Sequence, residues 1–144
     1  MKVIFTPVLA LLSVMSVSVA PLRAAEPADV QRLIETRECA GCNLSNADLS
    51  GAFLLGADLR DANLKGANLV NANLEGADLT GANLQDANLT GAFASNTVFQ
   101  DANMRDSQLT NANLSHSITT GAVLVGVELK GANLLESGIS IGGD

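Results

Sequence analysis

Apolar residues recur at every fifth position along most of the chain. In GADLRDANLKGANLVNANLEGADLTGANLQDANLTGA, residues 56–92, alanine recurs every fifth residue and leucine follows it two places later. The same frame runs through residues 42–141 without an insertion, which makes twenty units. An α-helix repeats near 3.6 residues and a strand near two, so neither alone keeps these leucines on one face.

The polar positions of each unit indicate where the chain turns. Leucine fills the centre of fifteen of the twenty units, and nothing larger than valine stands two places before the centre. The last position is Gly, Asn or Asp in seventeen units, and these residues favour turns or a positive φ. Each unit is therefore expected to form a short extended segment and a corner. Four corners close a square coil of twenty residues, and such coils stack about 4.8 Å apart.

The pattern thus predicts an all-β solenoid of about five coils, with leucines inside and polar residues outside. The tandem motif A-[DN]-L-x-x over residues 42–141 resembles the pentapeptide repeat family. This resemblance implies a right-handed quadrilateral β-helix. The stretch LIETRECAGCNLSNADLSGA, residues 33–52, is also similar to small exported pentapeptide repeat proteins that are common in cyanobacteria. Some members of the family resemble acidic duplex DNA in shape and charge, and bind a DNA topoisomerase.

The first 24 residues have the pattern of a secretory signal peptide. Lys2 supplies a positive charge, residues 3–20 are apolar, and small residues lead to the first acid, Glu26. We expect cleavage near Ala24, which removes residues 1–24. An uncleaved membrane anchor is the alternative, because an apolar run of this length approaches a membrane span. Cleavage predicts an exported protein without stable membrane insertion, located in the periplasm, or in the thylakoid lumen if the source is cyanobacterial.

Residues 25–41 predict a capping helix and a turn before the coils. Pro27 suits the first turn of a helix over residues 27–38. An apolar stripe follows it, formed by Val30, Leu33 and Ile34. Gly41 is the expected end of this helix, which we expect to cover the leucines of the first coil. The other end of the column has no such segment, since residues 142–144 form only a short tail.

The two cysteines, Cys39 and Cys42, form a C-x-x-C motif. Such a motif can be a local disulfide, half of a zinc site or a redox centre. A zinc site needs two further ligands, but the chain has no third cysteine and one histidine, His116. In an exported protein we expect a disulfide that joins the helix end to the first coil, with catalytic redox chemistry as the alternative.

Charge and chemistry exclude several functions. The full chain has a formal net charge of −7, and loss of Lys2 and Arg23 with the leader makes the protein more acidic. It has no basic patch, so nucleic-acid binding is not expected. Stacked acids such as Asp58 and Asp78 would make at most a weak Ca²⁺ site. A single histidine, His116, does not make a catalytic triad, and we expect no enzyme activity, metal or cofactor.

Residues that break the repeat are the candidates for a specific role. Several outward positions carry large apolar side chains where polar ones are the rule. They are Phe53, Leu55, Phe93, Val98, Ile118, Val125 and Leu135. Such residues would form a surface for a protein partner, although isolated exposed apolar residues are also common. Ala94 stands at a centre between the layers of Leu74 and Leu114, which predicts thinner packing there or an inward Phe93.

The last coil is strongly apolar and has no predicted cap. An open β end of this kind invites association, so we expect an end-to-end homodimer, with fraying or a fold-over of the last residues as the alternative. The sequence therefore predicts a non-enzymatic, exported scaffold or protein-interaction module. Two alternatives stay open. One is an acidic DNA mimic that binds a topoisomerase, which the leader disfavours, and the other is a redox protein that uses Cys39 and Cys42.

Overall fold

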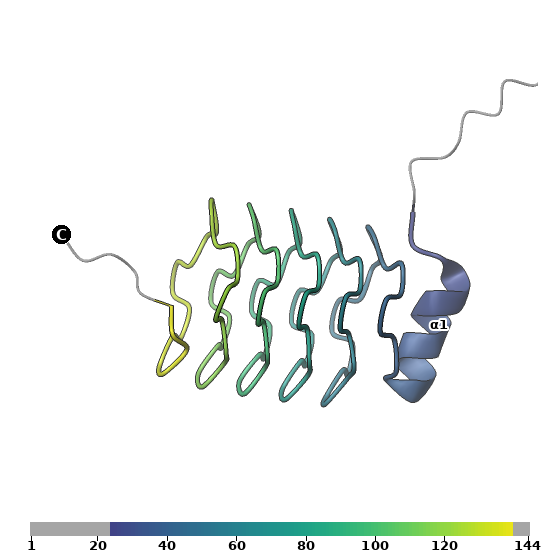
Figure 1. The fold of residues 1–144 in the computed structure, drawn as a ribbon, viewed down its shortest axis with the longest axis horizontal. Coiled ribbons are helices and arrows are strands. Elements are labelled where there is room, and N and C mark those ends of the chain that lie inside the picture. Colours follow the sequence, from purple (N-terminus) through teal and green to yellow (C-terminus); the bar gives the residue numbers. More distant parts are fainter. Residues whose placement is uncertain (1–23, 140–144) are drawn as a thin grey trace, which may run out of the picture.

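The computed structural model describes residues 24–139. Residues 1–23 of the predicted signal peptide, residues 140–141 at the end of the predicted repeats and the predicted tail at 142–144 lie outside these residues. Within them, the single helix is α1, Pro27–Thr36, and no helix has the length and apolar character to cross a membrane. The rest of the described chain winds into coils that stack in single file, with α1 lying across one end (Figure 1).

Parallel bridges between residues twenty positions apart hold the coils together. Asn63 bridges both Asn43 and Asn83, and the same step repeats through the column. At each rung the chain exchanges two backbone hydrogen bonds with the next coil. Leu64 donates its N–H to the carbonyl of Asn83 (2.8 Å), and Asn83 donates to the carbonyl of Ala62 (2.9 Å). Each coil side is thus one rung long, because the chain turns a corner before a longer strand can form.

The corners follow the predicted frame. Every fifth residue from Gly41 to Glu136 has a positive φ, including His116 (φ 58°) and Glu136 (φ 53°). The alanine before each centre lies just after such a corner, and its N–H donates to the previous central carbonyl, as from Ala67 to Leu64 (3.0 Å). This tight turn explains why the position accepts only small side chains. Four corners return the chain to the same side, and we name the sides by their centres Leu44, Leu49, Leu54 and Leu59.

The corner glycines have a second cause besides their positive φ. A Cβ added at Gly66 would lie 2.5 Å from Oδ1 of Asn46, the corner residue of the preceding coil. Gly76 follows a glycine, Gly56, and a Cβ there would meet nothing within 4 Å in the described part of the chain. At other corners a Cβ added to the glycine would also clash with Oδ1 of the corner residue one coil before. These pairs are Asp61 before Gly81, Asn71 before Gly91, Asp101 before Gly121, Asp106 before Gly126 and Asn111 before Gly131. Six of the eight described corners with Asn or Asp are thus followed by glycine in the next coil, the exceptions being Asp86 before Asp106 and Asn96 before His116.

Leucines fill the interior of the column, and the centres from Leu44 to Leu114 are almost completely buried. Ala94 has no exposed surface, but Phe93 is 55% exposed, so the expected inward rotation of Phe93 is wrong. Phe99, the next centre along the same coil, is fully buried instead. A large ring beside a small alanine preserves the volume of the layer, which is how a close-packed core tolerates such a change.

The helix α1 packs on the first coil through part of the predicted stripe. Leu33 is fully buried and Val30 packs against the core, but Ile34 is 51% exposed. The helix ends earlier than expected, because Arg37 takes the left-handed cap (φ 60°) and donates its N–H to the carbonyl of Leu33 (2.9 Å). Gly41 is therefore not the stop of the helix but the first corner of the coils.

The repeat frame also begins one unit earlier than the sequence pattern indicates. Glu38 bridges Asp58, and Cys39 is a fully buried central residue. Arg37 stands at the position of the alanine and Cys39 at that of the leucine, so the unit is unrecognisable by composition. The C-x-x-C motif thus lies inside the first coil rather than before it.

The last described coil differs from all coils above it. Its central residues, Leu124, Leu129, Leu134 and Ile139, are only partly buried. In the preceding coil Met104, Leu109 and Leu114 are fully buried. Packing from both neighbours, or from α1 and one neighbour, is what buries a central side chain completely.

Truncation of two central leucines of the Leu54 side should show the difference in packing between the interior coils and the last described coil. We expect Leu74→Ala to lower the free energy of unfolding by about 2–5 kcal/mol, because it leaves a cavity between two full layers. Leu134→Ala, at the partly buried end of the same column, should cost about 1–2 kcal/mol. Urea unfolding followed by circular dichroism measures both. Equal losses of unfolding free energy in the two variants would contradict the weaker packing of the last described coil.

A matched pair of glycines tests the corner rule. Gly66 and Gly76 have nearly equal φ (66° and 65°), so alanine at either should cost about 1–2 kcal/mol of unfolding free energy in backbone strain. Gly66→Ala should cost more, since its Cβ meets Oδ1 of Asn46. The additional change Asn46→Gly should remove this excess in urea unfolding. If Gly66→Ala and Gly76→Ala are equally stable, the side chain of Asn46 does not select the glycine.

Candidate functional site

Several of the exposed apolar residues lie on two adjoining sides of the column. Phe53 and Phe93, 57% and 55% exposed, belong to one outer row of the Leu54 side, where both bridge Asn73 between them. On the neighbouring Leu59 side, Val98 bridges Ile118, which is 48% exposed. Phe93, Val98 and Ile118 therefore flank one edge of the column, and we call these three residues the Phe93 edge.

The Leu44 side, which is opposite the Leu54 side, has a different chemistry. Its outer row is a ladder of amides, in which Asn63 donates to Oδ1 of Asn43 (3.2 Å) and Asn103 to Oδ1 of Asn83 (3.2 Å). The link between Asn83 and Asn63 is longer, at 3.5 Å. These polar groups satisfy one another within the protein, so this side offers less unsatisfied chemistry to a partner than the Phe93 edge does.

The remaining predicted contact residues lie near the two ends of the column. Val125 and Leu135 project from opposite sides of the last described coil, and they are 58% and 59% exposed. They do not adjoin the Phe93 edge, but they border the partly buried leucines of the open end. Val123 is exposed on the same side as Val125. The structure therefore divides the predicted surface into separate groups rather than one patch.

At the capped end, Phe53 and Leu55 lie on the first coil close to α1. The guanidinium carbon of Arg37 lies 5.6 Å from the centroid of the Phe53 ring, a cation–π geometry. Leu55 and Arg37 line one hollow with the end of α1. Ile34 is a further exposed apolar residue, on α1 itself. The sequence did not indicate the arginine contact, because it depends on where the helix ends.

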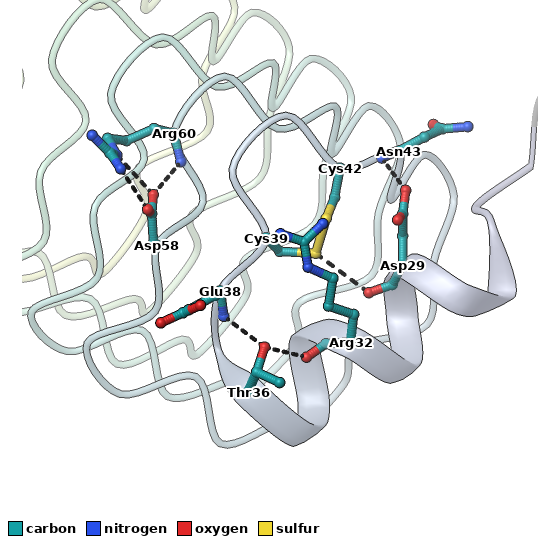
Figure 2. The surroundings of a disulfide bond; sticks show 9 residues. All are labelled: Asp29, Arg32, Thr36, Glu38, Cys39, Cys42, Asn43, Asp58 and Arg60. Carbon is teal, nitrogen blue, oxygen red and sulfur yellow. Dashed lines mark hydrogen bonds and ion pairs between the residues drawn. A yellow bond between two sulfur atoms is a disulfide. The ribbon is translucent and has the colours of Figure 1, made fainter.

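The two cysteines form a disulfide beneath α1 (Figure 2). Cys39 has no exposed surface and Cys42 is nearly as buried, and Sγ of Cys39 lies 3.3 Å from the carbonyl oxygen of Asp29. The carboxylate of Asp29 accepts the N–H of Asn43 (2.8 Å) and so ties α1 to the first coil. The disulfide is thus part of the junction between helix and coil.

The acidic pair proposed for Ca²⁺ is engaged by an arginine. Arg60 donates two hydrogen bonds to Asp58, at 2.8 and 2.6 Å, and Nε of Arg60 lies 4.0 Å from Asp78. The hydrogen bonds from the Arg60 side chain hold the pKa of Asp58 below its ordinary value. No group of three or more His, Cys, Asp and Glu residues suited to a metal occurs in residues 24–139. Cation binding therefore has no support at this place.

His116 is a corner residue of the Leu54 side. Its Nε2 lies 3.3 Å from a carboxylate oxygen of Glu136, which occupies the same corner one coil later, and both side chains are at least half exposed. Both residues stand at corners where Gly, Asn or Asp is the rule. Its position on the open surface gives it no pocket in which to bind a substrate.

A model of the pentapeptide repeats, in eight copies, matches residues 38–76, 77–115 and 107–137. The first match begins at Glu38, in agreement with the early start of the coils. None of the curated proteins matches the chain.

Several solved structures are similar to this chain. A pentapeptide repeat protein from the thylakoid lumen of Arabidopsis thaliana is 33% identical, over 65% of this chain and 66% of that one, with a TM-score of 0.50. One from the cyanobacterium Cyanothece 51142 is 29% identical, over 74% of this chain and 92% of its own, with a TM-score of 0.43. QnrB1, a plasmid-mediated fluoroquinolone resistance protein, is 20% identical over 66% of this chain and 54% of its own, with a TM-score of 0.38.

The Arabidopsis structure, together with the family match, implies a right-handed β-helix. The matched residues span most of the described chain, from the first coil at Glu38 to the last at Ser137. The resemblance that the repeated A-[DN]-L-x-x motif indicated is confirmed, and the chain belongs to the pentapeptide repeat family.

Proposed function

We propose that this protein is a non-enzymatic interaction module of an exported compartment, a quadrilateral column of about five coils that α1 closes at one end. The observation that carries the proposal is the Phe93 edge. Phe93 and Ile118 expose about half of their surface on a column whose repeat places polar residues outside. Neither side chain is needed to build a coil, and exposed aromatic and aliphatic groups of this kind are typical of the centre of a protein interface.

The closed interior supports a role without catalysis. Leucines with no exposed surface fill the coils, so substrate would find no space inside the column. His116 pairs with Glu136 on an open corner of the surface, where both side chains are at least half exposed. The two cysteines are buried under α1, which hinders the attack of a thiolate on their disulfide and disfavours the redox alternative.

Export rests on the sequence of the leader and on one structural neighbour. Residues 1–24 have the charge, apolar core and small residues of a signal peptide. The Arabidopsis protein, which is 33% identical with a TM-score of 0.50, comes from the thylakoid lumen. Both favour the periplasm or a lumen over the cytosol. Export also separates the protein from DNA topoisomerases, which disfavours the DNA-mimic alternative.

A second copy of the protein is the partner that we propose for the open end. There the central side chains are half-buried, as at Leu129 and Leu134, and Val125 and Leu135 extend the apolar surface. Because α1 covers the opposite end, stacking of open end on open end gives a closed, two-fold dimer rather than a filament.

Fractionation and affinity capture test the proposed function. We expect the protein in an exported fraction, and we expect the processed protein to capture a partner that the double variant Phe93→Ser/Ile118→Ser no longer holds. Val70→Ser, a half-buried apolar position on the Leu49 side, is the matched control and should retain the partner. A cytosolic protein that captures a topoisomerase would instead support the DNA-mimic function. A partner held equally by all variants would exclude the Phe93 edge.

Light scattering tests the homodimer. We expect a dimeric mass at micromolar concentration, and a monomeric mass for Val125→Lys/Leu135→Lys, because four buried ammonium groups would oppose an apolar interface. Val70→Lys should stay dimeric, and circular dichroism should show that all three proteins are folded. A monomeric mass for the unaltered protein throughout the micromolar range contradicts the dimer.

A further inference from the structure

A hollow of about 430 Å³ opens where the end of α1 meets the first coil. It lies at the capped end of the column, apart from the Phe93 edge and from the open end. Its lining is Arg32, Thr36, Arg37, Glu38, Ala40, Leu55, Gly56 and Asp58. In Figure 2 the side chain of Arg32 extends from α1 toward the first coil, and Asp58 with Arg60 lies beyond Glu38.

The hollow contains two arginines that lack an ionic partner. Within residues 24–139, neither Arg32 nor Arg37 lies within 4.0 Å of a carboxylate oxygen. Asp58, an acid on the coil wall of the hollow, is already held by two hydrogen bonds from Arg60. Glu38 is the only other acid among the lining residues. The lining thus combines two arginines without an ion pair with one acid, Asp58, that already pairs with Arg60.

Arg37 is positioned for recognition rather than free in solvent. Its guanidinium stacks on Phe53 at 5.6 Å, and such stacking leaves the N–H edge of the group available for a planar acceptor. The hydroxyl of Thr36 does not compete, because it donates to the carbonyl of Arg32 (2.8 Å) and accepts the N–H of Glu38 (3.1 Å). The arginines are therefore the groups that would meet a ligand.

The remaining walls limit what the ligand can be. Leu55, 42% exposed, and Ala40 supply an apolar wall beside the arginines, and Gly56 leaves its part of the wall open because it has no side chain. Glu38 and the acidic surface around the hollow repel a group with two negative charges more than a group with one. A carboxylate next to an aliphatic side chain fits both the charge and the wall.

We propose that this hollow binds an acidic segment of a protein partner, with one carboxylate between Arg32 and Arg37 and a neighbouring aliphatic side chain against Leu55. The inference rests on the proposed function in so far as the partner is a protein. It adds a second contact point, on the same Leu54 side as Phe93 but at the capped end. A partner that spans both points would lie along the column.

The test uses two short peptides and an NMR titration of the purified, ¹⁵N-labelled protein. Acetyl-Leu-Asp-Leu-amide should shift the amide signals of Arg37, Glu38, Ala40 and Gly56 in a saturable way, and the shifts should weaken with added salt. Acetyl-Leu-Asn-Leu-amide, which has the same shape without the charge, should bind at least about five-fold more weakly. Equal binding of the two peptides, or no shift at these amides, overturns the proposal.

Variants assign the effect to the arginines. Arg32→Gln and Arg37→Gln should each raise the dissociation constant of the acidic peptide about five-fold, while Arg105→Gln, an exposed arginine on the Leu44 side, should leave it unchanged. Inorganic phosphate should not saturate the same amides, and tighter binding of phosphate than of the peptide would overturn the assignment to a carboxylate. A partner that Phe93→Ser/Ile118→Ser still captures would count against the proposed function without changing the outcome of this titration.

Discussion

The backbone of this protein must adopt a left-handed conformation at every fifth residue, and the rest of the structure depends on that constraint. The corners from Gly41 to Glu136 all satisfy it. They bring neighbouring coils so close that the side chain of one corner occupies the space of the next, as Asn46 does at Gly66. Because the chain turns at every fifth residue, each side has room for only one hydrogen-bonded rung. The same spacing requires a small residue after each corner and directs the central leucines into the interior.

These steric requirements separate the residues that build the column from those that are available for a specific role. Leucine, alanine and the corner residues are required by the coil, and the amide ladder of the Leu44 side stabilises the surface that it covers. The Phe93 edge and the hollow under α1 serve no such purpose. Both contain groups that the fold leaves unsatisfied, apolar surface in one case and guanidinium groups in the other.

The period of five was sufficient to predict the coils, because each position of the unit has one steric requirement. The same reasoning failed where a residue was judged by its own unit alone. Thinner packing or an inward Phe93 was expected beside Ala94, but Phe93 is exposed and the large buried ring is Phe99, one side further along the coil. Cys39 was placed outside the coils because its unit resembles no other. The hollow depends on Arg37 ending the helix, and a local pattern does not indicate how two elements meet.

The structural period is twenty residues although the sequence period is five. The number of five-residue units between two residues therefore decides which sides of the column they occupy. A gain or loss of one unit between Phe53 and Phe93 would preserve the coil type but turn everything after it by one side. Phe93 would then leave the row of Phe53, and the corner residues would meet new neighbours. Four units would restore the alignment and only lengthen the column by one coil. The number of units between α1 and a surface thus determines which side of the column that surface faces, whatever side chains form the surface.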